Sequence, residues 1–441
     1  MNVRILAVVI VIGVATSALG CTSLREIRTE HSGVSLSEPD RTPPRECGTG
    51  GDAPGQVKHS IEDYGNYLLG FVEFDDQGWF YTDGTQMQTL VRRMHDELRD
   101  PAYAETGFLA LVFVHGWHHN AHDNDCNVQE FRAVVRLTSE RLNGGASQPS
   151  GRQRQRVIGI YVGWRGEAVD FPLVRYATIF DRRSSAEHVA KGSVRELFAQ
   201  IRRMQYETEQ KQGAGAKSAS MRTIVIGHSF GGLIAYHSLA QALLNDLTIA
   251  KRSGDADCQA ATERPPWPNQ IILVNPAFEA SRFEAIHRVA MRDDACPSPP
   301  ADRPKLIVVT AENDGATGTF FPMFRSVTTI FEKYNATSPE AKQAERASNT
   351  HAIGFVERYR THRLCLKEGR ALLSAERDVN PAAADPRSPV WVVTTTPDII
   401  DGHNGFLYAR KDSAAKPEPY LLDWLLQVYV THGSEMGECG S

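Results

Sequence analysis

Six short apolar runs, separated by longer segments, constrain the fold of this chain more than any other feature. They are FLALVFV (108–114), RVIGIYVGW (156–164), MRTIVIG (221–227), QIILV (270–274), KLIVV (305–309) and PVWVV (389–393). Apolar runs without polar alternation are typical of strands that are buried on both faces. Such strands need helices above and below them, so the pattern predicts an α/β fold with a mostly parallel central sheet.

The segments between these runs predict helices. In TQMQTLVRRMHDELRD the apolar residues recur at helical spacing, and the same periodicity is found over 128–142, 193–204 and 231–244. Ahead of them, YLLGFVEF and WFY (67–81) predict two strands around a tight turn. We expect one α/β domain over residues 61–435, with insertions between its core elements at about 165–185, 246–268 and 315–388.

The first twenty residues are expected to be a signal peptide. MNVR supplies one positive charge, and the apolar ILAVVIVIGVATSALG ends in small residues before Cys21. The ending ALGC resembles a bacterial lipobox, which implies lipidation of Cys21 and a membrane-anchored lipoprotein of the cell envelope, facing the periplasm or the exterior. An ordinary cleaved signal and an uncleaved anchor stay open as alternatives. Residues 22–60 are rich in Gly, Pro and charge and are predicted to be a flexible tether.

Charge and cysteine content limit the class of protein further. The net charge of −5 and the lack of a long basic run give no reason to expect a nucleic-acid partner. Besides Cys21 there are six cysteines, none at C-x-x-C spacing, which in an exported protein permit up to three disulfides. They are Cys47, Cys126, Cys258, Cys296, Cys365 and Cys439. The sequence does not rank the possible pairings.

One sequence motif indicates a type of reaction. Gly227-His228-Ser229-Phe230-Gly231 is a G-x-S-x-G sequence between a predicted buried strand and a predicted helix. A serine on such a sharp turn presents its hydroxyl above the sheet, beside the positive end of the helix dipole. In this context the chain resembles the α/β-hydrolase superfamily over roughly residues 65–430. The resemblance implies that Ser229 is a catalytic nucleophile, with its acid and histidine partners downstream.

The expected partners follow later strands. Asp314 in TAENDG is the favoured acid, with Glu312 as the alternative. Asp314 could also be a turn residue without a catalytic role, since N-D-G is a common turn sequence. His403, in the loop after the last apolar run, is the favoured base, with His351 as the alternative. His115-Gly116-Trp117, just after the first apolar run, is similar to the HG-x loop of lipases and esterases. That similarity implies an oxyanion hole formed by the backbone N–H groups of Trp117 and Phe230.

The histidines and aspartates of residues 115–125 also allow a metal-dependent hydrolase. Their spacing does not fit H-x-H-x-D-H, and no H-E-x-x-H occurs in the chain. We therefore expect no metal and no cofactor, with Asp123–Asp125 capping the following helix and Cys126 in a disulfide. The sequence predicts a membrane-anchored serine hydrolase that cleaves carboxylic esters, of lipids or of small molecules. The alternative is an envelope lipoprotein that uses the same fold as a non-catalytic scaffold.

Overall fold

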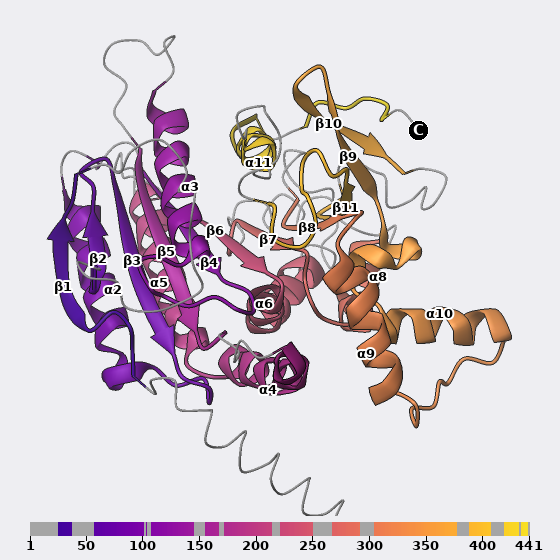
Figure 1. Cartoon of the computed structure of the whole chain (residues 1–441). Helices are drawn as coiled ribbons and strands as arrows, with labels where there is room; N and C mark the ends of the chain where they lie inside the picture. The colour runs from indigo at the N-terminus through magenta and orange to yellow at the C-terminus, as the bar shows by residue number, and fades with distance from the viewer. Residues whose placement is uncertain are drawn as a thin grey trace, which may run out of the picture.

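The computed structural model of the chain places eleven strands of the described residues in one sheet (Figure 1). It describes residues 25–37, 57–100, 103, 107–144, 155–166, 172–213, 221–249, 267–291, 304–376, 388–406, 419–431 and 434–439. The strands follow the order β1-β2-β3-β5-β4-β6-β7-β8-β11-β9-β10. Neighbours are parallel except for the β2/β3 and β9/β10 pairs. This confirms the expected α/β class and the mostly parallel sheet.

The six apolar runs all form strands at the centre of this sheet. They are β4 (Phe108–Val114), β5 (Arg156–Trp164), β6 (Met221–His228), β7 (Gln270–Val274), β8 (Leu306–Ala311) and β11 (Val390–Thr395). The remaining strands are β1 (Glu30–Ser35), β2 (His59–Asp63), β3 (Tyr67–Phe74), β9 (His362–Lys367) and β10 (Arg370–Ala375). The central strands are buried on both faces, so they lack polar alternation.

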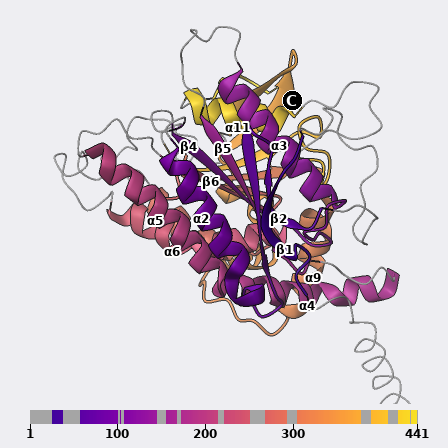
Figure 2. The same cartoon turned by 90° about the vertical axis from the view of Figure 1, so that its left-hand side faces the viewer.

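Helices cover both faces of the sheet (Figure 2). One face packs on α2 (Thr85–Arg99), α4 (Pro172–Lys191), α5 (Val194–Gly213), α6 (Phe230–Ile249) and α8 (Glu284–Ala290). The other face packs on α3 (Cys126–Asn143) and α11 (Tyr420–Thr431). Shorter elements are η1 (Tyr81–Gly84), η2 (Ala280–Phe283), η3 (Ala316–Phe320), α9 (Phe321–Thr328), α10 (Pro339–Thr350), η4 (Ile353–Phe355) and η5 (Glu357–Tyr359).

Two sequence predictions about strands are wrong. WFY does not form a second strand: Phe80 makes an isolated bridge to Phe74, and the chain then turns into η1. The segment 315–388 is not wholly an insertion, because its strand β9 pairs with β11 and extends the sheet. The apolar runs of β9 and β10 are only three residues long, and Arg363, Lys367 and Arg370 bound them, which is why their sequence gave no strand signal.

The predicted tether over 22–60 also needs correction. Within the described part of it, β1 pairs in parallel with β2 at the edge of the sheet. Arg28 lies just before β1, and its side chain is fully buried on the ring of Phe71, 3.9 Å from the ring centroid. A single buried arginine leaves no periodic pattern, so composition alone could not separate this segment from a flexible linker.

Arg28 belongs to a buried network of charges that joins β1 to the rest of the fold. Its Nη1 lies 2.8 Å from Glu62 Oε1, and Nη2 of Arg132 on α3 lies 2.6 Å from the same oxygen. Burial alone raises the pKa of Glu62, but the charges of Arg132 and Arg28 outweigh it and lower the pKa to about 2. Glu62 is therefore a carboxylate held between two cations, a stable arrangement only while both remain in place.

Only some of the predictions about the N-terminus and the cysteines concern residues that the structure describes. The signal peptide and Cys21 lie outside the described residues. None of the helices that are described is long and apolar enough to span a bilayer. Cys365 of β9 is disulfide-bonded to Cys439. Cys126 is also disulfide-bonded, which confirms that expectation, whereas Cys47, Cys258 and Cys296 lie outside the described residues.

Replacing Arg28 by Met should lower the free energy of unfolding by about 3–5 kcal/mol, because one charge of a buried ion pair is removed. The measurement is urea denaturation at pH 7. Arg203→Ala is the control, since its ion pair with Glu207 is exposed and such pairs contribute about 0–1 kcal/mol. Equal effects of the two substitutions would contradict a structural role for the segment that precedes β1.

Candidate active site

Ser229 lies on a strained turn between β6 and α6. Its φ of 55° is in the left-handed region, which is unusual for a residue other than glycine. The turn brings α6 so close to the end of β4 that a Cβ at Gly231 would lie 2.1 Å from the carbonyl oxygen of Val114. Only glycine fits there, which explains the second glycine of the G-x-S-x-G sequence.

Three side chains predicted from the sequence lie in hydrogen-bonding contact. His403 Nε2 is 2.9 Å from Ser229 Oγ, and His403 Nδ1 is 2.9 Å from Asp314 Oδ2. Ser229 follows β6, Asp314 follows β8 and His403 follows β11, so all three come from the carboxyl ends of parallel strands. Residues separated by 174 positions in the chain thus form one polar chain from hydroxyl through imidazole to carboxylate.

Asp314 is held as a carboxylate. The backbone N–H groups of Ala316 and Thr317 donate to its Oδ1 at 2.9 and 3.2 Å, and the Thr317 hydroxyl donates to Oδ2. Burial alone raises the pKa of Asp314, but the hydrogen bonds from His403 and Thr317 outweigh it, and the pKa is lowered. An ionised aspartate can fix the orientation of His403 and stabilise its protonated form.

The backbone of the His403 loop is held by two residues that the sequence analysis did not single out. Asn275, after β7, donates from Nδ2 to the carbonyls of Gly402 and His403 at 3.1 and 2.9 Å, and its Oδ1 accepts from the Ala311 N–H at 2.9 Å. His228 donates from Nε2 to the His403 carbonyl at 2.9 Å. The sequence offers one signal for Asn275, which is its position directly after an apolar run. It offers none for His228, which occupies a variable position of the G-x-S-x-G motif.

The loop after β4 lies against the Ser229 turn. A Cβ on Gly116 would lie 2.9 Å from Ser229 Cβ and 2.8 Å from His228 Nδ1, so glycine permits this approach. Trp117 follows Gly116, and Phe230 follows Ser229 as the first residue of α6. The two residues expected to supply oxyanion-hole amides therefore come from segments that touch beside the serine.

His115 has a structural position. Its Nε2 accepts a hydrogen bond from the Trp164 N–H at 3.0 Å, and its Nδ1 donates to the Gly116 carbonyl at 2.8 Å. Both bonds together need the neutral ring with its proton on Nδ1. Burial lowers the pKa of His115 to about 4, in agreement with these bonds. The ring therefore braces the loop by hydrogen bonds.

The other histidines and aspartates of residues 115–125 do not gather around a common point. His119 Nδ1 lies 3.1 Å from Asp125 Oδ1, and Asp125 caps α3 by accepting from the Asn127 N–H at 2.8 Å. The predicted helix cap is thus confirmed at Asp125. Within the described ranges, no group of three or more His, Cys, Asp or Glu side chains is arranged to hold a metal ion.

The two alternative residues lie in other interactions. Glu312 pairs with Arg363 of β9, with Oε1 2.7 Å from Nε. His351 follows α10, and its Nδ1 lies 3.2 Å from the Ala347 carbonyl and 2.9 Å from Thr350 Oγ1. The contacts with Ser229 and between the partners are made by Asp314 and His403, and not by these alternatives.

Comparison of the chain with protein-family models, with curated proteins and with solved structures gave no match.

Acidification should destabilise the protein through His115. Because its pKa is about 4 in the folded state and about 6.5 when unfolded, the unfolded state binds more protons between these values. Its contribution to stability is therefore lost as pH falls from about 6.5 towards 4, by at most about 1.4 kcal/mol per pH unit. Urea denaturation at pH 7 and pH 5 measures the loss.

The His115→Gln variant should lose less stability between these pH values than the unsubstituted protein. The exposed His188, replaced by Gln, is the control and should leave the loss unchanged. Glu130, whose pKa burial raises to about 7, opposes the trend, but it does so equally in all three proteins. The same loss in His115→Gln as in the control would contradict a neutral, buried His115.

Proposed function

We propose that this protein is a serine hydrolase of the α/β-hydrolase fold that cleaves carboxylic esters. The observation that carries the proposal is the hydrogen-bonded chain from Ser229 through His403 to Asp314, with both distances at 2.9 Å. Its support includes the strained turn at Ser229 and the order serine, aspartate, histidine along the chain. A strained backbone that carries a hydroxyl to the end of a central strand is a common property of functional sites.

In the first half of the reaction, His403 Nε2 takes the proton of Ser229 as Oγ attacks the ester carbonyl carbon. The carbonyl oxygen becomes an oxyanion, which the backbone N–H groups of Phe230 and Trp117 stabilise. The ester C–O bond then breaks, and the alcohol leaves with the proton from His403. An acyl group remains on Ser229.

In the second half, His403 takes a proton from water as the water oxygen attacks the acyl carbon. The second tetrahedral intermediate collapses, Ser229 recovers its proton from His403, and a carboxylic acid is released. Asp314 stays ionised throughout and holds His403 by its Nδ1–H. Besides the ester and water, the groups that take part are side chains and backbone amides of this chain.

The proposed setting is the bacterial cell envelope, with a lipid on Cys21 as the membrane anchor. The apolar run ILAVVIVIGVATSALG and the ALGC ending support this part of the proposal. Esters of lipids or of small molecules are the proposed substrates. A scaffold without activity would keep the fold and the disulfide, but would have no need for a serine, a histidine and a carboxylate in mutual contact.

A fluorophosphonate probe should label the protein at Ser229, and Ser229→Ala should abolish the labelling. Asp314→Asn should slow it by about 10⁴-fold, because the neutral amide no longer fixes the orientation and tautomer of His403. Mass spectrometry of the labelled peptide measures both effects. Ser374→Ala on β10 is the control and should label normally. Undiminished labelling of Ser229→Ala, or an unlabelled wild type, would favour the scaffold.

Asn275→Ala should lower kcat for a soluble nitrophenyl ester by about 10²-fold with little change in KM. The loop that carries His403 loses two hydrogen bonds to its backbone, and small misplacements of catalytic groups have costs of this order. The matched control is Asn335→Ala, at an exposed site in the connection before α10, which should keep the full rate. If kcat were unchanged in Asn275→Ala, the loop would not need this anchor.

A further inference from the structure

An exposed apolar stripe runs along α9 and the residues just after it. It consists of Met323, Val327, Ile330 and Phe331, whose exposed fractions are 63%, 73%, 71% and 93%. The spacing of four residues puts Met323 and Val327 on one side of α9, and Ile330 and Phe331 follow directly after its end. Contiguous exposed apolar surface of this kind is typical of a site that binds a partner or a membrane.

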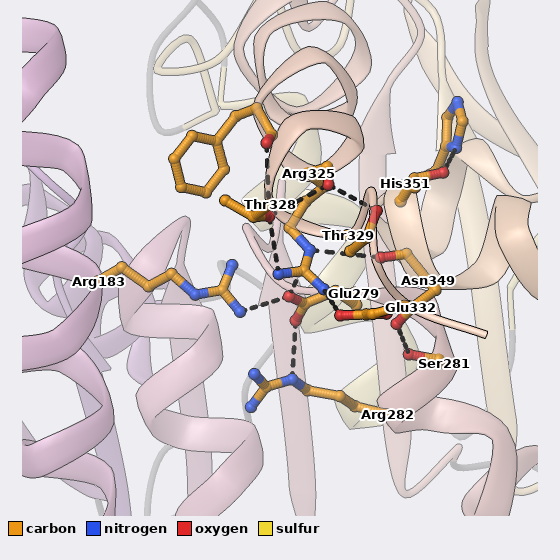
Figure 3. A network of polar contacts seen from close by, with 12 residues as sticks. Arg183, Glu279, Ser281, Arg282, Arg325, Thr328, Thr329, Glu332, Asn349 and His351 are labelled. Carbon is orange, nitrogen blue, oxygen red and sulfur yellow. Dashed lines mark hydrogen bonds and ion pairs between the residues drawn. The ribbon is translucent and has the colours of Figure 1, made fainter.

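The opposite side of α9 is anchored to the body of the protein (Figure 3). Arg325 Nε lies 2.8 Å from Oε1 of the buried Glu279, which also pairs with Arg183 at 2.5 Å and with Arg282 at 2.8 Å. Burial raises the pKa of Glu279, but the three arginines outweigh it and lower the pKa. A carboxylate shared by three cations fixes α9, so the apolar stripe is a constant part of the surface.

A basic cavity adjoins the apolar stripe between α9 and α10. Its volume is about 590 Å³, and its lining includes Ile330 of the stripe, the cations Lys342 and Arg346 and the hydroxyl groups of Ser326 and Tyr334. The one acid in the lining, Glu332, has Oε1 3.9 Å from Nη2 of Arg325. Cations and hydroxyl groups beside an apolar surface match the phosphate and acyl chains of an anionic phospholipid.

The stripe lies on the same side of the sheet as the beginning of the described chain, which follows the proposed lipid anchor. The N–H groups of Ile27 and Arg28 donate to Glu73 near the carboxyl end of β3, and α9 follows the carboxyl end of β8. In Figure 1 the carboxyl end of β3 and helix α9 both lie on the lower side of the molecule. Cys21 precedes Arg25 by four residues, which span at most about 14 Å. A bilayer that holds the proposed lipid on Cys21 therefore lies close to this side.

We propose that the apolar stripe and the basic cavity together dock on an anionic phospholipid bilayer. The stripe enters the boundary between headgroups and acyl chains, and Lys342 and Arg346 bind lipid phosphates. This surface turns the edge that carries Ser229 towards the membrane. The proposal does not require Ser229 to be catalytic.

The test uses the full chain in vesicles that contain a trace of phosphatidylcholine with a photoactivatable diazirine on its acyl chain. One set of vesicles is phosphatidylcholine alone, and the other contains about one quarter phosphatidylglycerol. After irradiation, mass spectrometry should find lipid on the peptides that cover residues 320–333. Labelling should be about tenfold stronger with phosphatidylglycerol, and about 1 M salt should remove that difference because charges are then screened within about 3 Å.

Variants separate the two parts of the surface. Val327→Asp should lower this labelling about tenfold in both vesicles, whereas the control Tyr206→Asp, at a 58% exposed position of α5, should not. The double variant Lys342→Glu and Arg346→Glu should lose the preference for phosphatidylglycerol but still be labelled. Ser229→Ala should be labelled like the wild type, so this test and that of the proposed function fail independently.

Three results would overturn the proposal. The first is an unlabelled 320–333 segment in both vesicles while thermal melting shows a folded protein. The second is equal labelling with and without phosphatidylglycerol, which would remove the role of the basic cavity. The third is a concentration-dependent dimer that Val327→Asp abolishes without any lipid labelling, which would assign the stripe to a second copy of the chain.

Discussion

The close approach of α6 to the end of β4 is the constraint on which the candidate site depends. At Gly231 even a Cβ atom has no room beside the Val114 carbonyl, and the chain reaches this position only through a left-handed serine. The strain at Ser229 is balanced by packing on both sides, because β6 and the first turns of α6 are almost entirely buried. The same approach puts Gly116 against the serine. The Ser229 turn and the loop of Gly116 are thus one packing unit, and neither can shift alone.

The parallel sheet gathers the remaining groups. Strands β4, β6, β7, β8 and β11 are successive neighbours, and each is followed by a residue of the site or its support. In this order they lead to Gly116, Ser229, Asn275, Asp314 and His403. Because parallel strands end at the same edge, groups far apart in sequence meet without long excursions of the chain. The antiparallel pairs lie towards the two ends of the sheet, away from these strands.

How much the sequence predicts depends on whether the signal is local. The central strands and the G-x-S-x-G sequence at Ser229 are predictable, because each is recognisable within a few positions. Asp314 and His403 were predicted from the chain order of the superfamily that the sequence resembles. Arg28 and β1 were not, because their burial depends on Glu62 and Glu73, more than thirty residues away. Asn275 was missed for a similar reason: it acts on backbone carbonyls of a loop 127 residues later in the chain. Strand β9 joins the central sheet by pairing with β11, which comes later in the chain, so its six residues carry little signal of their own.

The histidines around Ser229 illustrate how the fold assigns different roles to one residue type. His115 and His228 are buried, and burial lowers the pKa of both, so their rings stay neutral and serve as fixed donors and acceptors. His403 is held differently, since His228 and Asn275 bind its backbone carbonyl and leave its ring to Asp314 and Ser229. Its side chain is 22% exposed, so water can reach the ring. The backbone contacts thus fix the loop while Asp314 and Ser229 orient the ring, which is the arrangement that the proposed general base needs.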